Sequence, residues 1–163
     1  MRKVIVSIFI ASAALVMFSC RSSKEALSLS SMNGEWNIIE INGSAVVPGQ
    51  GQQLPFIGFD TTTGKVYGYS GCNRIIGSVD VNAKPGTIDL GALGSTRMAC
   101  PDMTLEQNVL GALAQVKGYK KMGKENMALC NASNRPVVIL AKKAADVKVA
   151  DLQGEWKITD VNG

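Results

Sequence analysis

The hydrophobic positions between residues 31 and 142 fall mainly into short runs that are bounded by turn residues. These runs are rich in β-branched and aromatic side chains, and they recur about every 8–12 residues, a spacing typical of antiparallel sheets and barrels. Asn42-Gly43 and Lys84-Pro85-Gly86 are examples of the turns between them. We therefore expect strands at residues 35–41, 55–60, 65–70, 75–81, 87–90, 94–99, 127–130 and 136–141.

One segment follows a helical period instead. Its apolar residues recur at intervals of three and four and form a single face: Leu105, Val109, Leu110, Leu113 and Val116. Thr104 and Gln107 match a capping box at the start of this segment, and Gly118 provides a stop at its end. We expect a helix of about 13 residues, roughly 20 Å long, that covers one side of the sheet with its apolar face in the core. The fold class is thus mostly β with one α-helix (α+β).

The N-terminus has the pattern of a bacterial secretion signal. A basic start is followed by a 15-residue apolar run, 4–18, which is shorter than the roughly 20 residues of a membrane-spanning helix. Ser19-Cys20 then resembles the site where a lipoprotein signal is cut and the thiol is acylated, although Met17 stands where leucine is more usual. We expect lipidation at Cys20; the alternative is a plain secretory signal cut near Ser19. Both interpretations place the domain outside the cytoplasm.

An internal repeat divides the rest of the chain. Residues 32–43 recur as residues 152–163, with six of twelve positions identical, including the tryptophan. We expect a signal peptide at 1–19, a flexible tether at 20–30, one complete domain at 31–142, a linker at 143–150, and the first strand of a second, truncated domain at 151–163. On this interpretation the chain is the front of a longer two-domain protein.

Composition excludes several function classes. The chain has no histidine, which removes Ser-His-Asp and Cys-His catalysis and every His-ligated metal site. Without Arg2 and Lys3 there are 15 basic and 13 acidic residues, a net charge of about +2, too near neutral to indicate nucleic-acid binding. The lysine pairs 120–121 and 142–143 indicate solvated surface, with a weak attraction to anionic headgroups as the alternative. We expect no catalytic residue, no metal and no cofactor.

Three stretches of the domain carry a family resemblance. They are Gly34-Glu35-Trp36, the segment 67–74 that ends in Gly71-Cys72-Asn73-Arg74, and Thr96-Arg97-Met98-Ala99-Cys100 just before the helix. Together they resemble the META/HslJ domain family over about residues 31–142. The resemblance implies a small antiparallel, partly open β-barrel with one helix, no established catalytic activity, and a loose association with stress responses of the bacterial envelope.

The same motifs suggest how the cysteines pair. Outside the cytoplasm two thiols tend to oxidise, and the family motifs favour Cys72 with Cys100, which would close a 29-residue loop and contribute roughly 3–4 kcal/mol. Cys130 then remains, either as a buried small apolar residue or as a reactive sensor thiol. Asn73 and Arg74 also have two interpretations. Arg74 could grip an anion or a partner's carboxylate, or the pair could be structural, with Asn73 closing the turn.

Two functions follow from these features. The first is a non-enzymatic module of the cell envelope, anchored to a membrane, most readily the outer membrane, by the lipid on Cys20, and binding an unknown envelope protein. The second is a carrier of a small apolar ligand inside the partly open barrel, although a barrel filled with its own side chains would have the same sequence pattern.

Overall fold

The computed structural model describes residues 27–144. The expected signal peptide, the expected lipidation site Cys20 and the second copy of the repeat lie outside the described residues. The elements are η1 (Leu29–Met32), β1 (Gly34–Ile41), β2 (Ser44–Ala45), β3 (Phe56–Asp60), β4 (Lys65–Tyr69), β5 (Arg74–Ser78), β6 (Gly94–Ser95), α1 (Thr104–Leu113), β7 (Gly118–Met122), β8 (Asn126–Cys130) and β9 (Pro136–Lys142).

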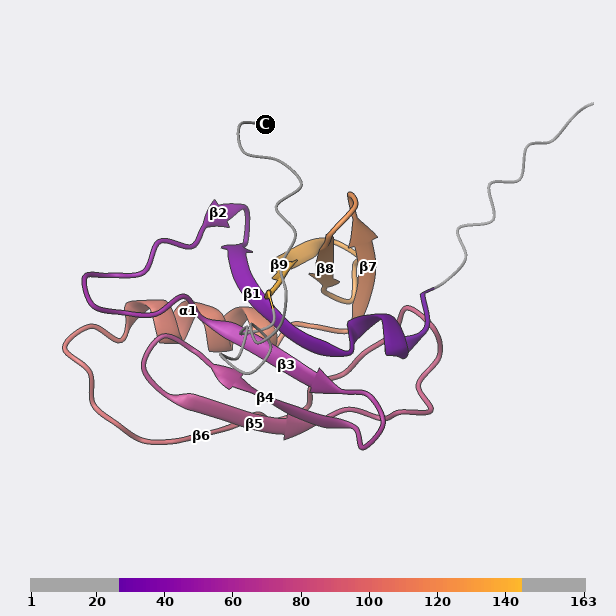
Figure 1. The fold of residues 1–163 in the computed structure, drawn as a ribbon, viewed down its shortest axis with the longest axis horizontal. Coiled ribbons are helices and arrows are strands. Elements are labelled where there is room, and N and C mark those ends of the chain that lie inside the picture. Colours follow the sequence, from indigo (N-terminus) through magenta and orange to yellow (C-terminus); the bar gives the residue numbers. More distant parts are fainter. Residues whose placement is uncertain (1–26, 145–163) are drawn as a thin grey trace, which may run out of the picture.

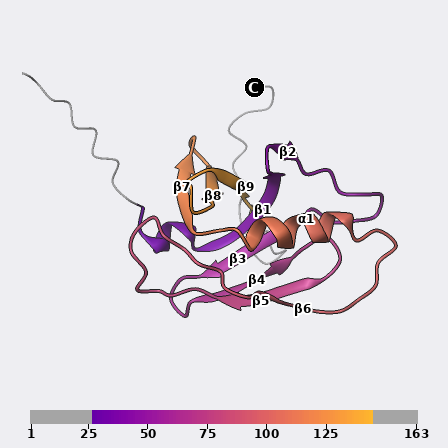
Figure 2. The ribbon, with the colours of Figure 1, turned by 180° about the vertical axis from the view of Figure 1, so that it is seen from behind.

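The strands between residues 27 and 144 form one antiparallel sheet, which curls but does not close. Eight of them follow the order β6-β5-β4-β3-β1-β9-β8-β7, and β2 pairs with β1 outside this path. The strands at the two ends of the order, β6 and β7, do not pair with each other within the described residues. Figures 1 and 2 show the two halves of the sheet splayed apart, with α1 lying between them. The expected mostly β, partly open barrel with one helix is confirmed.

The opening of the barrel begins within β1. The first half of β1 pairs with β3, from Gly34 to Asn37, and its second half has β9 on one side and the two residues of β2 on the other. Asn42 and Gly43 both have positive φ, 50° and 84°, as a two-residue hairpin turn requires, so the expected Asn-Gly turn joins β1 to β2. Because β3 leaves β1 after Asn37, the sheet splits there, and α1 packs against β1 and β9.

The space inside the curled sheet is filled by side chains. The largest of those that are almost completely buried are Phe59, Met32, Ile38, Ile57, Ile75, Leu113, Leu129 and Leu140. From α1, Val109, Ala112 and Leu113 belong to this core, while Leu105 and Leu110 pack against it from partly exposed positions. The helix is therefore held by the apolar face that the sequence predicts.

The chain enters the fold earlier than expected. Residues 27–30, which the sequence analysis assigns to a flexible tether, are part of the folded body: Leu29 is buried, and the carbonyl oxygen of Leu27 accepts hydrogen bonds from Tyr119 Oη (2.7 Å) and Gly86 N (3.0 Å). At the other end, Lys143 pairs with Glu35 at 2.7 Å, so the expected linker also begins within the folded body.

The structure corrects the ends of the helix. It has ten residues, ending at Leu113, and Gly118 is the first residue of β7 rather than a helix stop. The expected capping box is wrong, because Met103 is the N-cap residue and Asp102 Oδ1 accepts from Thr104 N at 2.8 Å.

Two expected strands and one unexpected strand also differ between the sequence analysis and the structure. Residues 87–90 form no strand, and Thr87 makes only an isolated bridge to Gly118. Strand β7 was missed because its exposed lysines break the apolar pattern at the edge of the sheet. The expected run 94–99 is ordered as a strand only at Gly94–Ser95.

Candidate functional site: a polar groove beside the helix

Asn73 is at the centre of a buried hydrogen-bond network. Its side chain is 1% exposed, and its amide nitrogen donates to Glu106 Oε1 (3.0 Å) on α1 and to the carbonyl oxygen of Met98 (3.1 Å). Its amide oxygen accepts from Met98 N (2.8 Å) and from Thr96 Oγ1 (2.7 Å). Its backbone nitrogen donates to Glu106 Oε2 at 2.9 Å. All hydrogen-bonding groups of this side chain have partners inside the protein, and these partners lie on α1 and in the segment 96–98 rather than in the turn itself.

The disulfide joins the same parts of the chain. Cys72 and Cys100 are bonded, with their Cα atoms 6.1 Å apart, so the pairing implied by the family motifs is present. The bond and the Asn73 network together attach the segment before α1 to the turn between β4 and β5. The two family motifs therefore form one structural unit, which holds the start of α1 against the sheet.

Arg74 and Cys130 have different surroundings. The Arg74 backbone nitrogen donates to Thr96 Oγ1 (3.1 Å), while its side chain is exposed, so its role as an interaction residue stays a prediction. Cys130 is 2% exposed and lies in a small cluster with Ala128 and Ile139. Burial raises the pKa of the Cys130 thiol, and this favours the interpretation as a buried apolar residue over a reactive one.

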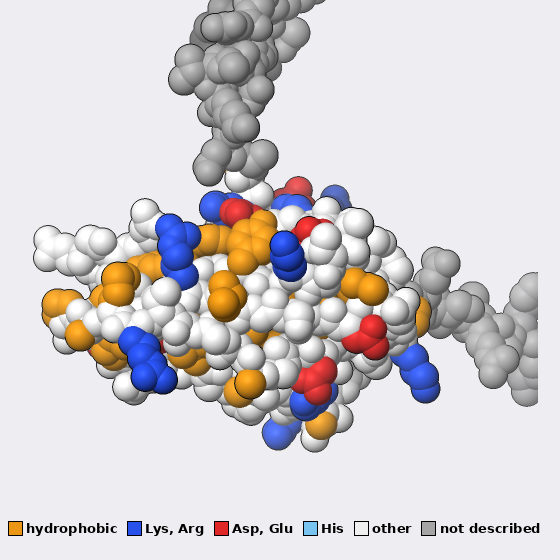
Figure 3. Space-filling model, turned by 90° about the horizontal axis from the view of Figure 1, so that it is seen from below, with side chains coloured by type: hydrophobic (Ala, Val, Ile, Leu, Met, Phe, Trp, Pro, Cys, Tyr) orange, Lys and Arg blue, Asp and Glu red, His pale blue; other side chains and the backbone are white. Residues whose placement is uncertain are grey.

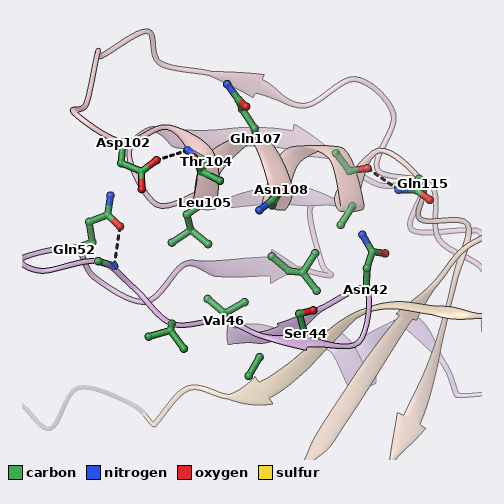
Figure 4. A pocket seen from close by; sticks show the side chains of 16 residues that line it. Asn42, Ser44, Val46, Gln52, Asp102, Thr104, Leu105, Gln107, Asn108 and Gln115 are labelled. Atoms are coloured by element: carbon green, nitrogen blue, oxygen red, sulfur yellow. Dashed lines mark hydrogen bonds between the residues drawn. The ribbon is translucent and has the colours of Figure 1, made fainter.

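A surface groove of about 640 Å³ lies where the sheet splits. One wall is the β1–β2 hairpin with the loop that follows it, and the other is the exposed face of α1 (Figure 4). Five carboxamide side chains line it: Asn42, Gln52, Gln107, Asn108 and Gln115. Val46, Val47 and Leu105 supply its apolar surface, and Val47 is 81% exposed. No lysine, arginine or aromatic residue is among the described residues that line it.

Three of these carboxamides are available to a ligand. Among residues 27–144, the side chains of Asn42, Gln107 and Asn108 have no hydrogen-bond partner, whereas Gln52 accepts from Gly49 N (3.0 Å) and Gln115 donates to the carbonyl oxygen of Gly111 (3.0 Å). Asn42 and Asn108 come from opposite walls of the groove (Figure 4). Asp102, the one carboxylate among the described lining residues, has a lowered pKa because it accepts hydrogen bonds from Thr104.

The sequence analysis missed this groove. Thr104, Asn108, Gly111 and Gln115 follow a helical spacing and form the small and polar face opposite the core, which was a recognisable signal. At Gly111 a Cβ would meet no atom within 4 Å, so the groove is open at that point. What the helical period could not show is that the β1–β2 hairpin stands opposite this face.

A second groove of about 540 Å³ lies around the point where the chain enters the fold. It is lined by Leu27, Ser31, Trp36, Lys121, Lys124, Glu125, Asn126, Met127, Lys142 and Ala144. The two grooves share no residue. In Figures 1 and 2, β2 with the loop of the first groove and η1 with the β7–β8 hairpin of the second lie toward opposite ends of the molecule.

Comparison with known proteins agrees with this architecture. A sequence model of the META domain matches residues 27–144. The chain belongs to the META domain family. This META domain starts at the residue where the structure begins to be described, four residues before the expected boundary at 31. No curated protein sequence matches the chain.

One solved structure shares the fold, and a second is similar over most of its length. A protein from Burkholderia xenovorans, determined by NMR, is 24% identical with a TM-score of 0.54 and covers 71% of this chain and 86% of its own. A DUF4847 family protein from Bacteroides vulgatus, determined by crystallography, is 16% identical with a TM-score of 0.47 and covers 71% of this chain and 96% of its own. At 24% identity the first likeness concerns the fold alone.

Within residues 27–144 there is no helix with the length and apolar character needed to cross a bilayer. Seen from below, apolar side chains lie in several separate groups, with basic and acidic side chains between them (Figure 3).

Proposed function

We propose that this META domain is a non-enzymatic envelope module, held to a membrane by a lipid on Cys20, that binds an extended polypeptide segment in the groove beside α1. The observation that carries the proposal is the pair of unengaged carboxamides, Asn42 and Asn108, on opposite walls of an open groove. The lipoprotein pattern before Cys20 supports the anchor, and with it a place in the cell envelope.

The chemistry of the lining favours a polypeptide over other ligands. A carboxamide donates and accepts hydrogen bonds as a peptide group does, so Asn and Gln side chains can satisfy both backbone groups of an extended chain. The apolar surface of Val46, Val47 and Leu105 suits side chains of such a segment. Nucleic acid would require basic residues in the lining, and a glycan is usually held by an aromatic ring; the described lining has neither.

The carrier function has less support. An acyl chain needs an apolar cavity, and the interior of this sheet is filled by the side chains of Phe59, Ile38, Leu113 and their neighbours. An apolar ligand in the first groove would cover carboxamides without satisfying them, which is unfavourable. Both described grooves lie at the surface rather than inside the barrel.

A substitution at Gly111 tests the groove. Gly111→Leu places an apolar side chain in the groove, at a position where a Cβ meets no atom within 4 Å, and leucine is a better helix former than glycine by nearly 1 kcal/mol. Ala114→Leu is the matched control: it introduces the same side chain at an exposed position near the end of α1, outside the groove lining.

The assay is photo-crosslinking in the bacterial envelope. A photoreactive amino acid at position 47 of the full chain, where Val47 lines the groove and is 81% exposed, is expected to give an adduct with one polypeptide, mapped by mass spectrometry to a single extended segment. Gly111→Leu should abolish the adduct, and Ala114→Leu should leave it unchanged. An adduct that survives Gly111→Leu, or one that contains lipid or glycan instead of protein, would refute the proposal.

A further inference from the structure

The second groove gathers positive charge from segments that are far apart in the sequence. Lys121 and Lys124 come from the β7–β8 hairpin, and Lys142 comes from the end of β9; Glu125 is the one acidic residue of the described lining. Within residues 27–144, Lys121 and Lys124 form no ion pair. These two ammonium groups are therefore free to interact with an anion.

The floor of this groove is rigid and partly aromatic. The Lys142 ammonium lies 4.4 Å from the centroid of the Trp36 ring and also donates to the carbonyl oxygen of Asn33. Trp36 Nε1 donates to the carbonyl oxygen of Met32 at 2.7 Å, which fixes the ring. Lys142 is thus positioned by the protein, while Lys121 and Lys124 project from the hairpin at the rim.

The groove is also where the chain enters the fold. Leu27 forms part of its lining, and Cys20 is seven residues earlier in the sequence. Seven residues span at most about 25 Å when fully extended. If Cys20 carries the lipid, as the proposed function holds, this end of the domain cannot move further than that from the membrane surface.

Met122, on the β7–β8 hairpin with Lys121 and Lys124, is 45% exposed but is not among the described residues that line the groove, so the lysines would carry the interaction with a membrane surface. Lysines are attracted to an anionic surface only within about a Debye length of it, roughly 8–10 Å. The short segment between Cys20 and Leu27 lets Lys121 and Lys124 come close enough to the membrane for this attraction to act.

We propose that the groove formed by Lys121, Lys124, Lys142 and Trp36 docks the META domain onto the headgroups of anionic phospholipids. The occupant is the phosphodiester group of such a lipid, held by the lysines. This inference rests on the proposed anchor at Cys20. Docking through this end directs the peptide groove, which lies toward the opposite end of the molecule, away from the membrane.

Quenching of tryptophan fluorescence measures the docked state. The full chain, purified from bacterial membranes and carrying Trp156→Phe so that Trp36 is the sole tryptophan, is placed in vesicles that contain a lipid with a spin label on its headgroup. The vesicles are either neutral phosphatidylcholine or contain about a third phosphatidylglycerol. Trp36 should be quenched strongly in the anionic vesicles and weakly in the neutral ones, and half-molar salt should remove the difference.

Paired substitutions separate the lysines from general charge. Each lysine near an anionic surface favours binding about fivefold, so Lys121→Gln with Lys124→Gln should lower the ratio of docked to undocked domain about 25-fold. Arg97→Gln with Arg135→Gln removes the same charge from exposed positions outside the groove and should change the quenching little.

The outcomes distinguish the inference from the anchor. A chain that does not float with neutral vesicles lacks the lipid, and the proposed anchor then fails. A chain that floats with both kinds of vesicle but shows equal quenching in each refutes headgroup docking and leaves the anchor intact. Equal loss of quenching in the two paired variants would also refute docking through this groove.

Discussion

Removal of the Asn73 side chain should destabilise the fold more than any change at the surface of the groove. Asn73→Ala leaves the Glu106 carboxylate, which is 6% exposed, with only the backbone nitrogen of residue 73 as its partner. A hydrogen bond to a charged group contributes about 1.5–3 kcal/mol, and a buried acceptor without a partner costs about 1–3 kcal/mol. The other partners, Thr96 and Met98, are exposed and can bond to water. We therefore expect a loss of about 3 kcal/mol.

The measurement is urea unfolding of the purified chain, followed by far-ultraviolet circular dichroism and analysed by linear extrapolation. Asn108→Ala is the control, since Asn108 is exposed on the same helix as Glu106 and should change stability by less than about 0.5 kcal/mol. A double-mutant cycle of Asn73→Ala with Glu106→Ala should show a coupling energy of about 2 kcal/mol. A loss below about 1 kcal/mol for Asn73→Ala, or additive effects in the cycle, would contradict the reasoning.

An isosteric substitution at position 73 tests whether the negative charge of Glu106 matters for stability. Asn73→Asp places a second carboxylate oxygen about where the amide nitrogen lies, 3.0 Å from Glu106 Oε1. Two carboxylates at this distance cannot both ionise without a large penalty. At neutral pH the variant should be at least as unstable as Asn73→Ala. Its deficit relative to the wild type should shrink as the pH falls, because the two close carboxylates of the folded variant take up a proton at a higher pH than the separated carboxyl groups of the unfolded chain. A deficit independent of pH would show that charge is not the cause.

The remaining predictions concern the cysteines and two glycines. Reduction of the Cys72–Cys100 bond, which closes a loop of 29 residues, should lower the free energy of unfolding by roughly 3–4 kcal/mol in the same experiment. A loss near zero would mean that the hydrogen bonds of Asn73 alone hold the segment before α1 on the sheet. Cys130 should resist alkylation at pH 8 until urea unfolds the chain, because burial raises the pKa of its thiol. The extent of alkylation is measured by mass spectrometry. Rapid labelling of the native protein would favour the interpretation of Cys130 as a reactive sensor thiol. Gly68→Ala should destabilise by about 3 kcal/mol because its Cβ would overlap the backbone oxygen of Phe56 in β3. Gly111→Ala, in open space, should stabilise by up to about 1 kcal/mol. Equal effects of the two substitutions in thermal unfolding would refute the packing argument.

Features with a short sequence period were predictable. Strands β1, β3, β4, β5, β8 and β9 follow from β-branched runs between turns, and the core face of α1 follows from a period of three to four. The Asn42-Gly43 turn follows from the positive φ that these two residues tolerate. The disulfide could be expected only because two family motifs each carry one cysteine; neither periodicity nor composition pairs Cys72 with Cys100.

Features at the margins of the fold were less predictable. The edge strand β7 has lysines where an inner strand has apolar residues, so its pattern resembles a loop. Residues 27–30 contain serines that suggest a tether, yet Leu27 and Leu29 pack onto the core. In both segments the local composition indicates exposure to solvent. The pairing of β7 with β8 and the packing of residues 27–30 on the core depend on residues elsewhere in the sequence.

The sequence by itself determined the core face of α1, most of the inner strands, the Asn42-Gly43 turn and the membership of the META family. Only the tertiary structure decided what those elements bring together. Asn73 bonds to Glu106, which is 33 residues later in the sequence. The first groove forms only because the β1–β2 hairpin lies opposite α1. The second groove forms where residues at the start of the fold lie beside the β7–β8 hairpin. The physical reason is that sequence periodicity shows which face of a single helix or strand is buried. A site forms between the faces of two elements, and the distance between those elements depends on the strand order and the curl of the whole sheet.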